Sequence, residues 1–179
     1  FDYFAQENTQ RNIGACLRAA TVVTVSTETL RNQLWPAATV IRNAWNNYNF
    51  PLPSTREPPN KVIAWRGSPT HSEDLLPYAD DIVKMYKQFP EYSWSFFGGL
   101  NWQLAKMLPD TDRVKIYGSS DVMSYLTSLK EERPEWLIVP LKDSAFNRAK
   151  SDIAFLEATW AGAVTLAPDL PEWTRGAVL

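Results

Sequence analysis

The sequence has 179 residues, of which 45% are hydrophobic, and it carries a net charge of −2. This length suits one domain or a domain with part of another, and eight tryptophans and eight phenylalanines allow a sizeable core, which excludes a disordered chain. The near-neutral charge excludes a broad surface for nucleic acid, no apolar run approaches the ~20 residues that span a bilayer, and no signal-peptide pattern opens the chain.

The chain has one cysteine and one histidine. Cys16 alone excludes an internal disulfide framework and favours a reducing compartment, so we expect a cytoplasmic protein. Because it stands in a helical pattern beside Leu17, we expect its thiol to be buried. We expect no metal and no cofactor, because no ligand cluster, Walker loop or dinucleotide fingerprint is present.

Strand-like apolar runs alternate with helical patterns along the chain. A helical pattern over 9–19 precedes a run at 21–26, and further runs follow at 62–66, 94–98, 114–117, 136–141 and 163–167. Most runs are continuous, which is typical of strands buried on both faces of a parallel sheet. Helical patterns separate the later runs, at 78–89, 100–108, 121–130 and in a short helix that stops at Gly162. The sequence therefore predicts an α/β fold with a right-handed, doubly wound parallel sheet.

A stretch rich in Asn and Pro, at 43–60, interrupts this alternation and is typical of an extended linker. We expect three parts: 1–45 as the end of an N-terminal domain with its crossover, 46–60 as a linker, and 61–179 as a second domain. The sequence pattern at Phe1 is typical of the middle of a helix or strand, and the chain ends at Leu179, shortly after a predicted strand. We therefore read the chain as a fragment of a longer protein, with the second domain truncated at its C-terminus.

The helix before Gly162 carries one acidic side chain on its apolar side. At about 100° per residue, Glu157 lies in the stripe that contains Leu156 and Trp160, whereas Asp152 lies opposite. A carboxylate in that position is costly unless it is hydrogen-bonded. A hydroxyl of a bound ligand is a candidate partner.

The pair Lys150 and Ser151 stands at the N-terminus of the same helix. Free backbone N–H groups and the helix dipole favour an anion there, Lys150 adds a charge and Ser151 a hydroxyl, so a phosphate is the natural ligand. The alternative is that Ser151 is an N-cap and Lys150 a solvated charge. Together with Glu157, the pattern favours a nucleoside diphosphate with its pyrophosphate at the helix tip and its ribose at the carboxylate.

The turn over 66–74 follows another strand and so belongs to the same, carboxyl edge of the sheet. Gly67 allows a ligand to approach the backbone closely, and Arg66 or His71 is able to face the same phosphates. An exposed His71 without a function is the alternative. Two glycine turns, at 98–99 and 118–120, are either tight turns or further parts of this edge.

The stretch over 146–168, FNRAKSDIAFLEATWAGAVTLAP, resembles the donor-binding half of GT-B fold glycosyltransferases, and more narrowly the retaining group 1 (family 4-like) enzymes. In that family a helix glutamate holds the nucleotide ribose, and Glu157 matches it. A subgroup opens this helix with F-N-x-x-K-S, which Phe146, Asn147, Lys150 and Ser151 match. The segment WRGSPTHSEDL resembles the first loop of the donor domain, and ATVVTVSTETL resembles the last strand of the acceptor domain, so the resemblance covers nearly the whole chain.

The resemblance implies a Rossmann-like donor domain with a remnant of the preceding acceptor domain. It implies an enzyme of polysaccharide biosynthesis that transfers a sugar, with retention, from a nucleotide-diphosphate sugar to an acceptor held by a missing N-terminal domain. Catalysis would come from positioning the donor and stabilising the departing diphosphate, and the fragment alone would be inactive. The implied donor-binding residues are Arg66, Gly67, His71, Lys150, Ser151 and Glu157.

The sequence also departs from the family pattern. The family spaces two glutamates as E-x7-E, of which the first contacts the donor sugar, and that position is Ala149 here. The usual loop has Gly-Arg and a later Lys, whereas Arg66 precedes Gly67 and His71 stands near the place of the Lys. Two alternatives therefore stay open, a non-catalytic nucleotide-binding module and a GT-B-type epimerase. A Rossmann-like oxidoreductase lacks its glycine fingerprint.

Overall fold

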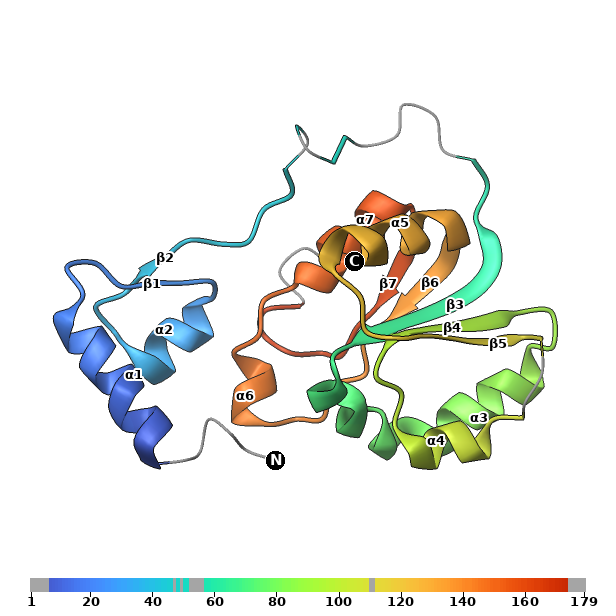
Figure 1. The fold of residues 1–179 in the computed structure, drawn as a ribbon, viewed down its shortest axis with the longest axis horizontal. Coiled ribbons are helices and arrows are strands. Elements are labelled where there is room, and N and C mark those ends of the chain that lie inside the picture. Colours follow the sequence, from blue (N-terminus) through green and yellow to red (C-terminus); the bar gives the residue numbers. More distant parts are fainter. Residues whose placement is uncertain (1–6, 47, 49, 52–56, 110–111, 174–179) are drawn as a thin grey trace.

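The computed structural model describes residues 7–46, 48, 50–51, 57–109 and 112–173. Its main feature is a five-stranded sheet in the order β5-β4-β3-β6-β7, in which every neighbouring pair is parallel (Figure 1). The strands are β3 (Asn60–Gly67), β4 (Ser93–Gly98), β5 (Val114–Tyr117), β6 (Pro134–Ile138) and β7 (Val164–Leu166). The strand order reverses between β3 and β6, and ligands of open α/β sheets bind beyond the carboxyl ends of strands at such a point.

Helices cover both faces of this sheet. Figure 1 shows α3 (Ala79–Gln88) and α4 (Trp102–Met107) on one face, and α5 (Val122–Glu132) and α7 (Ile153–Ala161) on the other. Each face of the sheet has its own apolar cluster. Side chains alternate along a strand, so neighbouring residues of β4 belong to different clusters. Phe96 packs with α3 and α4, whereas Phe97 packs with α5 and α7. The predicted doubly wound α/β fold is confirmed.

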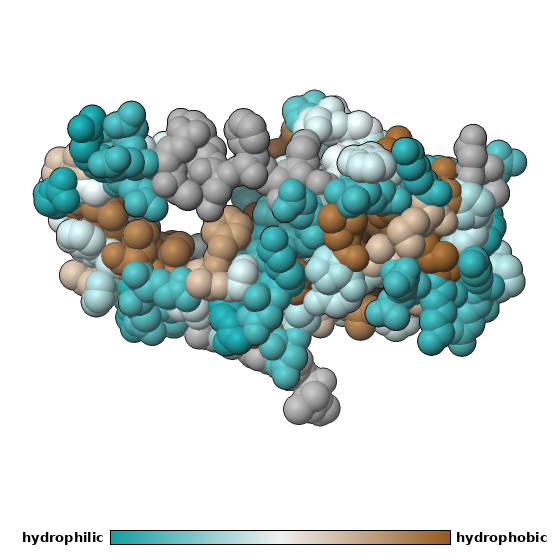
Figure 2. Space-filling view, turned by 90° about the horizontal axis from the view of Figure 1, so that it is seen from below, coloured by the Kyte–Doolittle hydropathy of each residue, from teal (hydrophilic) through white to brown (hydrophobic). Residues whose placement is uncertain are grey.

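A smaller unit precedes the sheet. It contains α1 (Glu7–Ala19), β1 (Thr24–Val25), α2 (Glu28–Leu34) and β2 (Thr39–Val40), and β1 and β2 pair in parallel. No residue of α1 is buried, and apolar residues lie on the surface at this end of the molecule (Figure 2). The prediction that Cys16 is buried is therefore wrong: its thiol is exposed, because little of the described chain packs against α1.

Short elements account for the other differences from the sequence prediction. The run at 21–26 contributes only β1, and β6 ends at Ile138 because Pro140 has no N–H for the ladder. Two short helices, α2 and α6 (Ala145–Arg148), were not expected; they begin at Thr27 and Ser144, whose hydroxyls accept hydrogen bonds from backbone N–H groups of the first turn. The turn over 66–74 contains a 3-10 helix, η2 (Pro69–Asp74), followed by η3 (Leu76–Tyr78).

Hydrogen bonds join the small unit to the five-stranded unit. The Thr27 hydroxyl donates to the carbonyl oxygen of Ala149 (2.8 Å), and the buried Glu172 accepts from the backbone N–H and hydroxyl of Thr29 (3.0 and 2.7 Å). The crossover after β2 also reaches the sheet, since Asn43 donates to the Ser151 hydroxyl (2.6 Å). No described residue between Val40 and Asn60 belongs to a helix or strand. The division at 45 and 60 stays a prediction.

A second buried carboxylate, Glu132 at the end of α5, lies beneath the sheet. It accepts hydrogen bonds from Ser95 (2.8 Å), Lys115 (2.8 Å) and the Tyr117 hydroxyl. Burial alone would raise the pKa of Glu132, but these hydrogen bonds hold it below its ordinary value. Glu132 thus stays ionised for structural reasons, and it lines neither of the cavities described below.

None of the helices within the described ranges combines the length and the apolar character that a membrane span requires.

Candidate nucleotide-binding site

Two cavities open at the carboxyl ends of the strands, and Arg66 at the end of β3 lines both. The first, the lysine cavity, has a volume of about 220 Å³ and is lined by Trp65, Arg66, His71, Asp74, Val139, Pro140, Leu141, Lys150, Ser151, Ile153, Ala154 and Trp173. The second, the glycine cavity, has a volume of about 320 Å³ and is lined by Arg66, Gly67, Ser68, Phe97, Gly98, Gly118, Ser119, Ser120, Val122, Tyr125 and Glu157. All six residues predicted for the site therefore line one cavity or the other.

Glu157 lies at the wall of the glycine cavity and faces inward, with 13% of its side chain exposed. Its Oε2 atom lies 2.8 Å from Nε of Arg66 and accepts a hydrogen bond from the Tyr125 hydroxyl (3.0 Å). Burial raises the pKa of Glu157, and the positive charge of Arg66 opposes that rise. The pKa of Tyr125 is raised as well, by burial and then by the adjacent carboxylate.

A ligand hydroxyl was the partner expected for Glu157 from its sequence pattern, and the structure shows two protein partners, Arg66 and Tyr125. Both contacts converge on Oε2, and the other carboxylate oxygen, Oε1, takes part in neither. The burial of Glu157 is therefore explained without a ligand. The sequence did not predict that Arg66 and Tyr125 contact Glu157. The three residues belong to β3, α5 and α7, which meet only in the folded chain.

Lys150 and His71 lie side by side at the wall of the lysine cavity. Nζ of Lys150 is 2.9 Å from Nδ1 of His71, and the two side chains are 20% and 28% exposed. Burial lowers the pKa of Lys150, the charge of Asp74 opposes this effect, and the nearby Arg66 adds to it. The structure thus brings together two side chains that are 79 positions apart in the sequence and that were both predicted for the phosphates.

The start of α7 differs in detail from the prediction. The helix begins at Ile153 with Asp152 in the N-cap position, and Asp152 makes no side-chain capping bond. Ser151 therefore is not the N-cap, and its hydroxyl accepts from Asn43 of the crossover. Lys150 and Ser151 still lie directly before the helix, and both line the lysine cavity.

Two glycines pack where β3 and β4 end. A Cβ on Gly67 would lie 2.5 Å from the Trp65 ring and 3.0 Å from Cβ of His71, so the glycine is needed for packing. Gly98 has a φ of +99°, and a Cβ there would overlap the carbonyl oxygen of Gly67, which accepts a hydrogen bond from Gly99 (3.2 Å). The glycine turn at 98–99 therefore closes the edge of the sheet, and the same two glycines form part of the glycine cavity.

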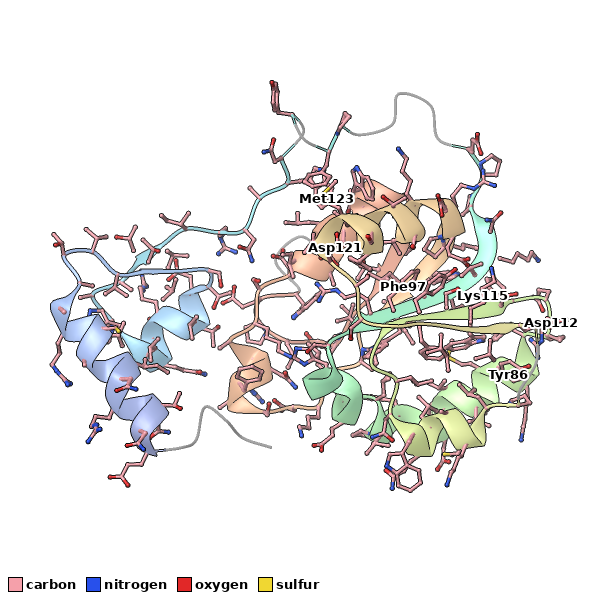
Figure 3. The ribbon with its side chains drawn as sticks, in the orientation of Figure 1. Tyr86, Phe97, Asp112, Lys115, Asp121 and Met123 are labelled. Carbon is pink, nitrogen blue, oxygen red and sulfur yellow. The ribbon has the colours of Figure 1, made fainter. Side chains whose placement is uncertain are left out.

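Aromatic side chains and the start of α5 form the far wall of the glycine cavity. Phe97 stacks on Tyr117, with ring centroids 4.5 Å apart, and meets Tyr125 edge to face. Figure 3 shows Phe97 on the sheet below Asp121 and Met123, which begin α5. The Asp121 carboxylate caps that helix by accepting from the backbone N–H groups of Met123 and Ser124. This wall offers an aromatic surface and a fixed helix start.

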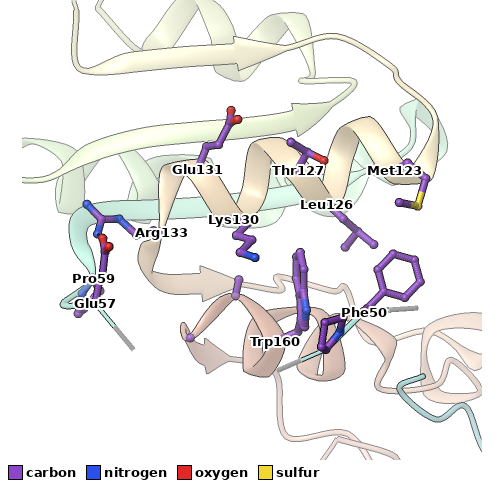
Figure 4. A pocket seen from close by; sticks show the side chains of 13 residues that line it. Phe50, Glu57, Pro59, Met123, Leu126, Thr127, Lys130, Glu131, Arg133 and Trp160 are labelled. Atoms are coloured by element: carbon purple, nitrogen blue, oxygen red, sulfur yellow. The ribbon is translucent and has the colours of Figure 1, made fainter. Parts of the chain in front are cut away.

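The largest described cavity lies elsewhere, between the linker and the outer side of α5 and α7. It has a volume of about 680 Å³, and Figure 4 shows Phe50 and Leu126 near the Trp160 ring inside it. Its lining is mainly apolar, and its charged residues, among them Lys130 and Arg133, stand toward the end of α5. Because it does not lie at the carboxyl ends of the strands, where open α/β sheets bind ligands, we do not assign the chemistry to it. Within the described residues no group of three or more His, Cys, Asp or Glu side chains is arranged to hold a metal ion.

No family model and no curated protein matches the sequence. Among solved structures, the fold is similar to that of TarM, with a TM-score of 0.65 and 13% identity over 98% of this chain. A TarM variant of S. aureus in complex with fondaparinux, α-GlcNAc-glycerol and UDP gives 0.64 and 16% over 97% of this chain. The pneumococcal O-GlcNAc transferase GtfA in complex with UDP and GlcNAc gives 0.58 and 13% over 94% of this chain.

The chain spans 35% of the length of each TarM chain and 34% of that of GtfA. At these identities the similarity concerns the fold and not the residues of a site. The chain has the fold of GT-B glycosyltransferases.

Proposed function

We propose that this chain binds the nucleotide-diphosphate sugar of a glycosyltransferase, which passes the sugar, with retention, to an acceptor. One observation carries the proposal: at the point where the strand order reverses, Arg66 lines two adjoining cavities. His71 and Lys150 line one of them, and the inward carboxylate of Glu157, which pairs with Arg66, lines the other. A nucleoside diphosphate needs both kinds of group, because its phosphates are anionic and its ribose hydroxyls are hydrogen-bond donors.

We assign the pyrophosphate to the lysine cavity. Lys150 and His71 lie together at its wall, Ser151 adds a hydroxyl, and the first N–H groups of α7 lie just beyond. Arg66 lines this cavity from the sheet side. These groups would also stabilise the charge that develops on the diphosphate as it leaves the sugar.

We assign the nucleoside to the glycine cavity. Oε1 of Glu157 is the acceptor for the ribose hydroxyls, because Oε2 is occupied by Arg66 and Tyr125. The base would then lie against the backbone of Gly67 and the aromatic wall that includes Phe97. Since Arg66 lines both cavities, one extended molecule passing Arg66 is able to occupy the two together.

A non-catalytic nucleotide-binding module is the second candidate, and Ala149 favours it. Ala149 is buried, and its carbonyl oxygen accepts from the Thr27 hydroxyl, so this position offers no side-chain contact to a donor sugar. The module would bind nucleotide through the same residues without transferring a sugar. Either function suits the cytoplasm, since the exposed thiol of Cys16 fits a reducing compartment.

The two candidates differ in turnover. We expect the protein to bind UDP or another nucleoside diphosphate in calorimetry, and to release that diphosphate from the matching nucleotide sugar when it is incubated with candidate acceptors. Lys150→Ala is expected to lower the rate of release by at least about tenfold, since a hydrogen bond to a charged group contributes about 1.5–3 kcal/mol. Binding without release supports the module, interconversion of the sugar supports an epimerase, and the absence of binding to UDP, GDP, dTDP and ADP contradicts both candidates.

A further inference from the structure

A buried carboxylate lies directly behind the two side chains that we assign to the phosphates. Asp74, the last residue of η2, is 5% exposed. Its Oδ2 atom lies 3.2 Å from Nδ1 of His71 and 3.8 Å from Nζ of Lys150. A carboxylate buried to this degree destabilises the fold unless both of its oxygens have hydrogen-bond or ionic partners.

The other oxygen of Asp74 is held from the opposite side. Asn147, which is 1% exposed on α6, donates from Nδ2 to Oδ1 of Asp74 (2.9 Å) and to the carbonyl oxygen of Lys142 (2.9 Å). The backbone N–H of Asn147 is fixed in turn by the Ser144 hydroxyl (3.1 Å). One oxygen of Asp74 is thus anchored to a rigid buried amide, and the other faces the lysine cavity.

This arrangement keeps Asp74 charged. Burial alone would raise the pKa of Asp74, but hydrogen bonds from His71 and Asn147 and the charge of Lys150 bring it below its ordinary value. In the other direction, burial, Arg66 and Lys142 lower the pKa of Lys150, and Asp74 is the group that opposes them. The carboxylate therefore favours the ammonium form of Lys150 despite two neighbouring cations, Arg66 and Lys142.

The short contact between Lys150 and His71 follows from the same arrangement. Nδ1 of His71 lies between Nζ of Lys150 (2.9 Å) and Oδ2 of Asp74 (3.2 Å), so the three groups form one connected cluster. Both side chains are oriented before any phosphate arrives.

We infer that Asp74, anchored by Asn147, is a positioning residue that holds Lys150 and His71 side by side toward the diphosphate of the donor. The inference rests on the proposed function. Asp74 and Asn147 would then contribute to binding without touching the ligand. They order the side chains of Lys150 and His71 in advance, which removes an entropic cost from binding.

The test compares UDP binding by the wild-type protein and Asp74→Asn, which keeps the shape of the side chain and removes its charge. Positioning predicts that UDP binds about tenfold more weakly at neutral pH, as expected when a hydrogen bond to a charged group is lost. Without Asp74, the Lys150 ammonium gives up its proton more readily. As the pH rises, the affinity of Asp74→Asn for UDP should therefore begin to fall at a lower pH than the affinity of wild type. A purely electrostatic view predicts the opposite, since removing a negative charge would tighten the binding of an anion.

Three controls separate this role from a structural one. Calorimetric stoichiometry counts the folded sites, so a partly unfolded variant lowers the number of sites and not their affinity. Glu132→Gln removes another buried carboxylate with Lys and Tyr partners, and it should leave UDP affinity unchanged. In a Lys150→Met background, Asp74→Asn should have a smaller effect than in wild type, because one of the two side chains that it positions is gone.

Unchanged or tighter binding of UDP by Asp74→Asn, with the same pH profile as wild type, would overturn the inference and leave the proposed function intact. Fully additive effects of the two substitutions would overturn it as well. If wild type binds none of the four nucleoside diphosphates, the proposed function and the inference fail together.

Discussion

Glu157→Gln is expected to weaken UDP binding by about 10- to 100-fold, because a hydrogen bond to a charged group contributes about 1.5–3 kcal/mol. The amide still offers an oxygen to Arg66 and Tyr125 but no charge, so the free energy of unfolding should also fall, and the calorimetric stoichiometry counts the sites that remain folded. The lost affinity should come from the ribose hydroxyls, which would meet a neutral amide in place of Oε1. Calorimetry with UDP measures the effect.

Two comparisons locate the effect at the ribose. Wild type should bind UDP more tightly than 2′-deoxy-UDP, and Glu157→Gln should lose most of that preference. Binding of inorganic pyrophosphate, which has no ribose, should be similar in both proteins. The matched control is again Glu132→Gln, which removes a carboxylate paired with a cation and a tyrosine but lines neither cavity. An equal preference for UDP over its deoxy form in wild type and Glu157→Gln would contradict the ribose assignment.

The largest effect on stability is expected from Gly98→Ala. The φ of +99° is unfavourable for a residue with a side chain, and the new Cβ would overlap the carbonyl oxygen of Gly67. Strain of this kind costs about 1–3 kcal/mol, and the overlap with backbone adds to it, so we expect a loss of at least about 3 kcal/mol in the free energy of unfolding. Urea denaturation followed by tryptophan fluorescence is a suitable measurement.

Gly118→Ala is the matched substitution on the neighbouring strand edge. Among the described residues, no atom lies within 4 Å of a Cβ built there, and the backbone needs no glycine, so we expect a change within about 0.5 kcal/mol. A similar cost for the two substitutions would show that the β3 and β4 ends do not approach as closely as described.

The regular part of the fold was predictable from the sequence because burial determines it. Continuous apolar runs such as WSFFG mark strands covered on both faces, and the single carboxylate among apolar residues in α7 correctly indicated an inward Glu157. The short helices α2 and α6 were not predictable by periodicity, since seven and four residues are too few to show it. Their caps, Thr27 and Ser144, were the available signal.

The site was only partly predictable, because contacts between distant segments have no signal in a single sequence. The residues expected at the phosphates do line the cavities, but the pairing of Arg66 with Glu157 and of Lys150 with His71 depends on how β3, η2 and α7 meet. Asp74 follows His71 by three positions, the spacing of neighbours in a 3-10 helix, so that contact could have been proposed from the sequence.

The structure of the protein with UDP bound would test the central claim most directly. Our account predicts ribose hydroxyls within hydrogen-bond distance of the Glu157 carboxylate and a β-phosphate in contact with Lys150, with the nucleotide passing Arg66 from one cavity to the other. UDP bound anywhere else, for example between the linker and Trp160, with both cavities empty and the Arg66–Glu157 pair unchanged, would contradict it.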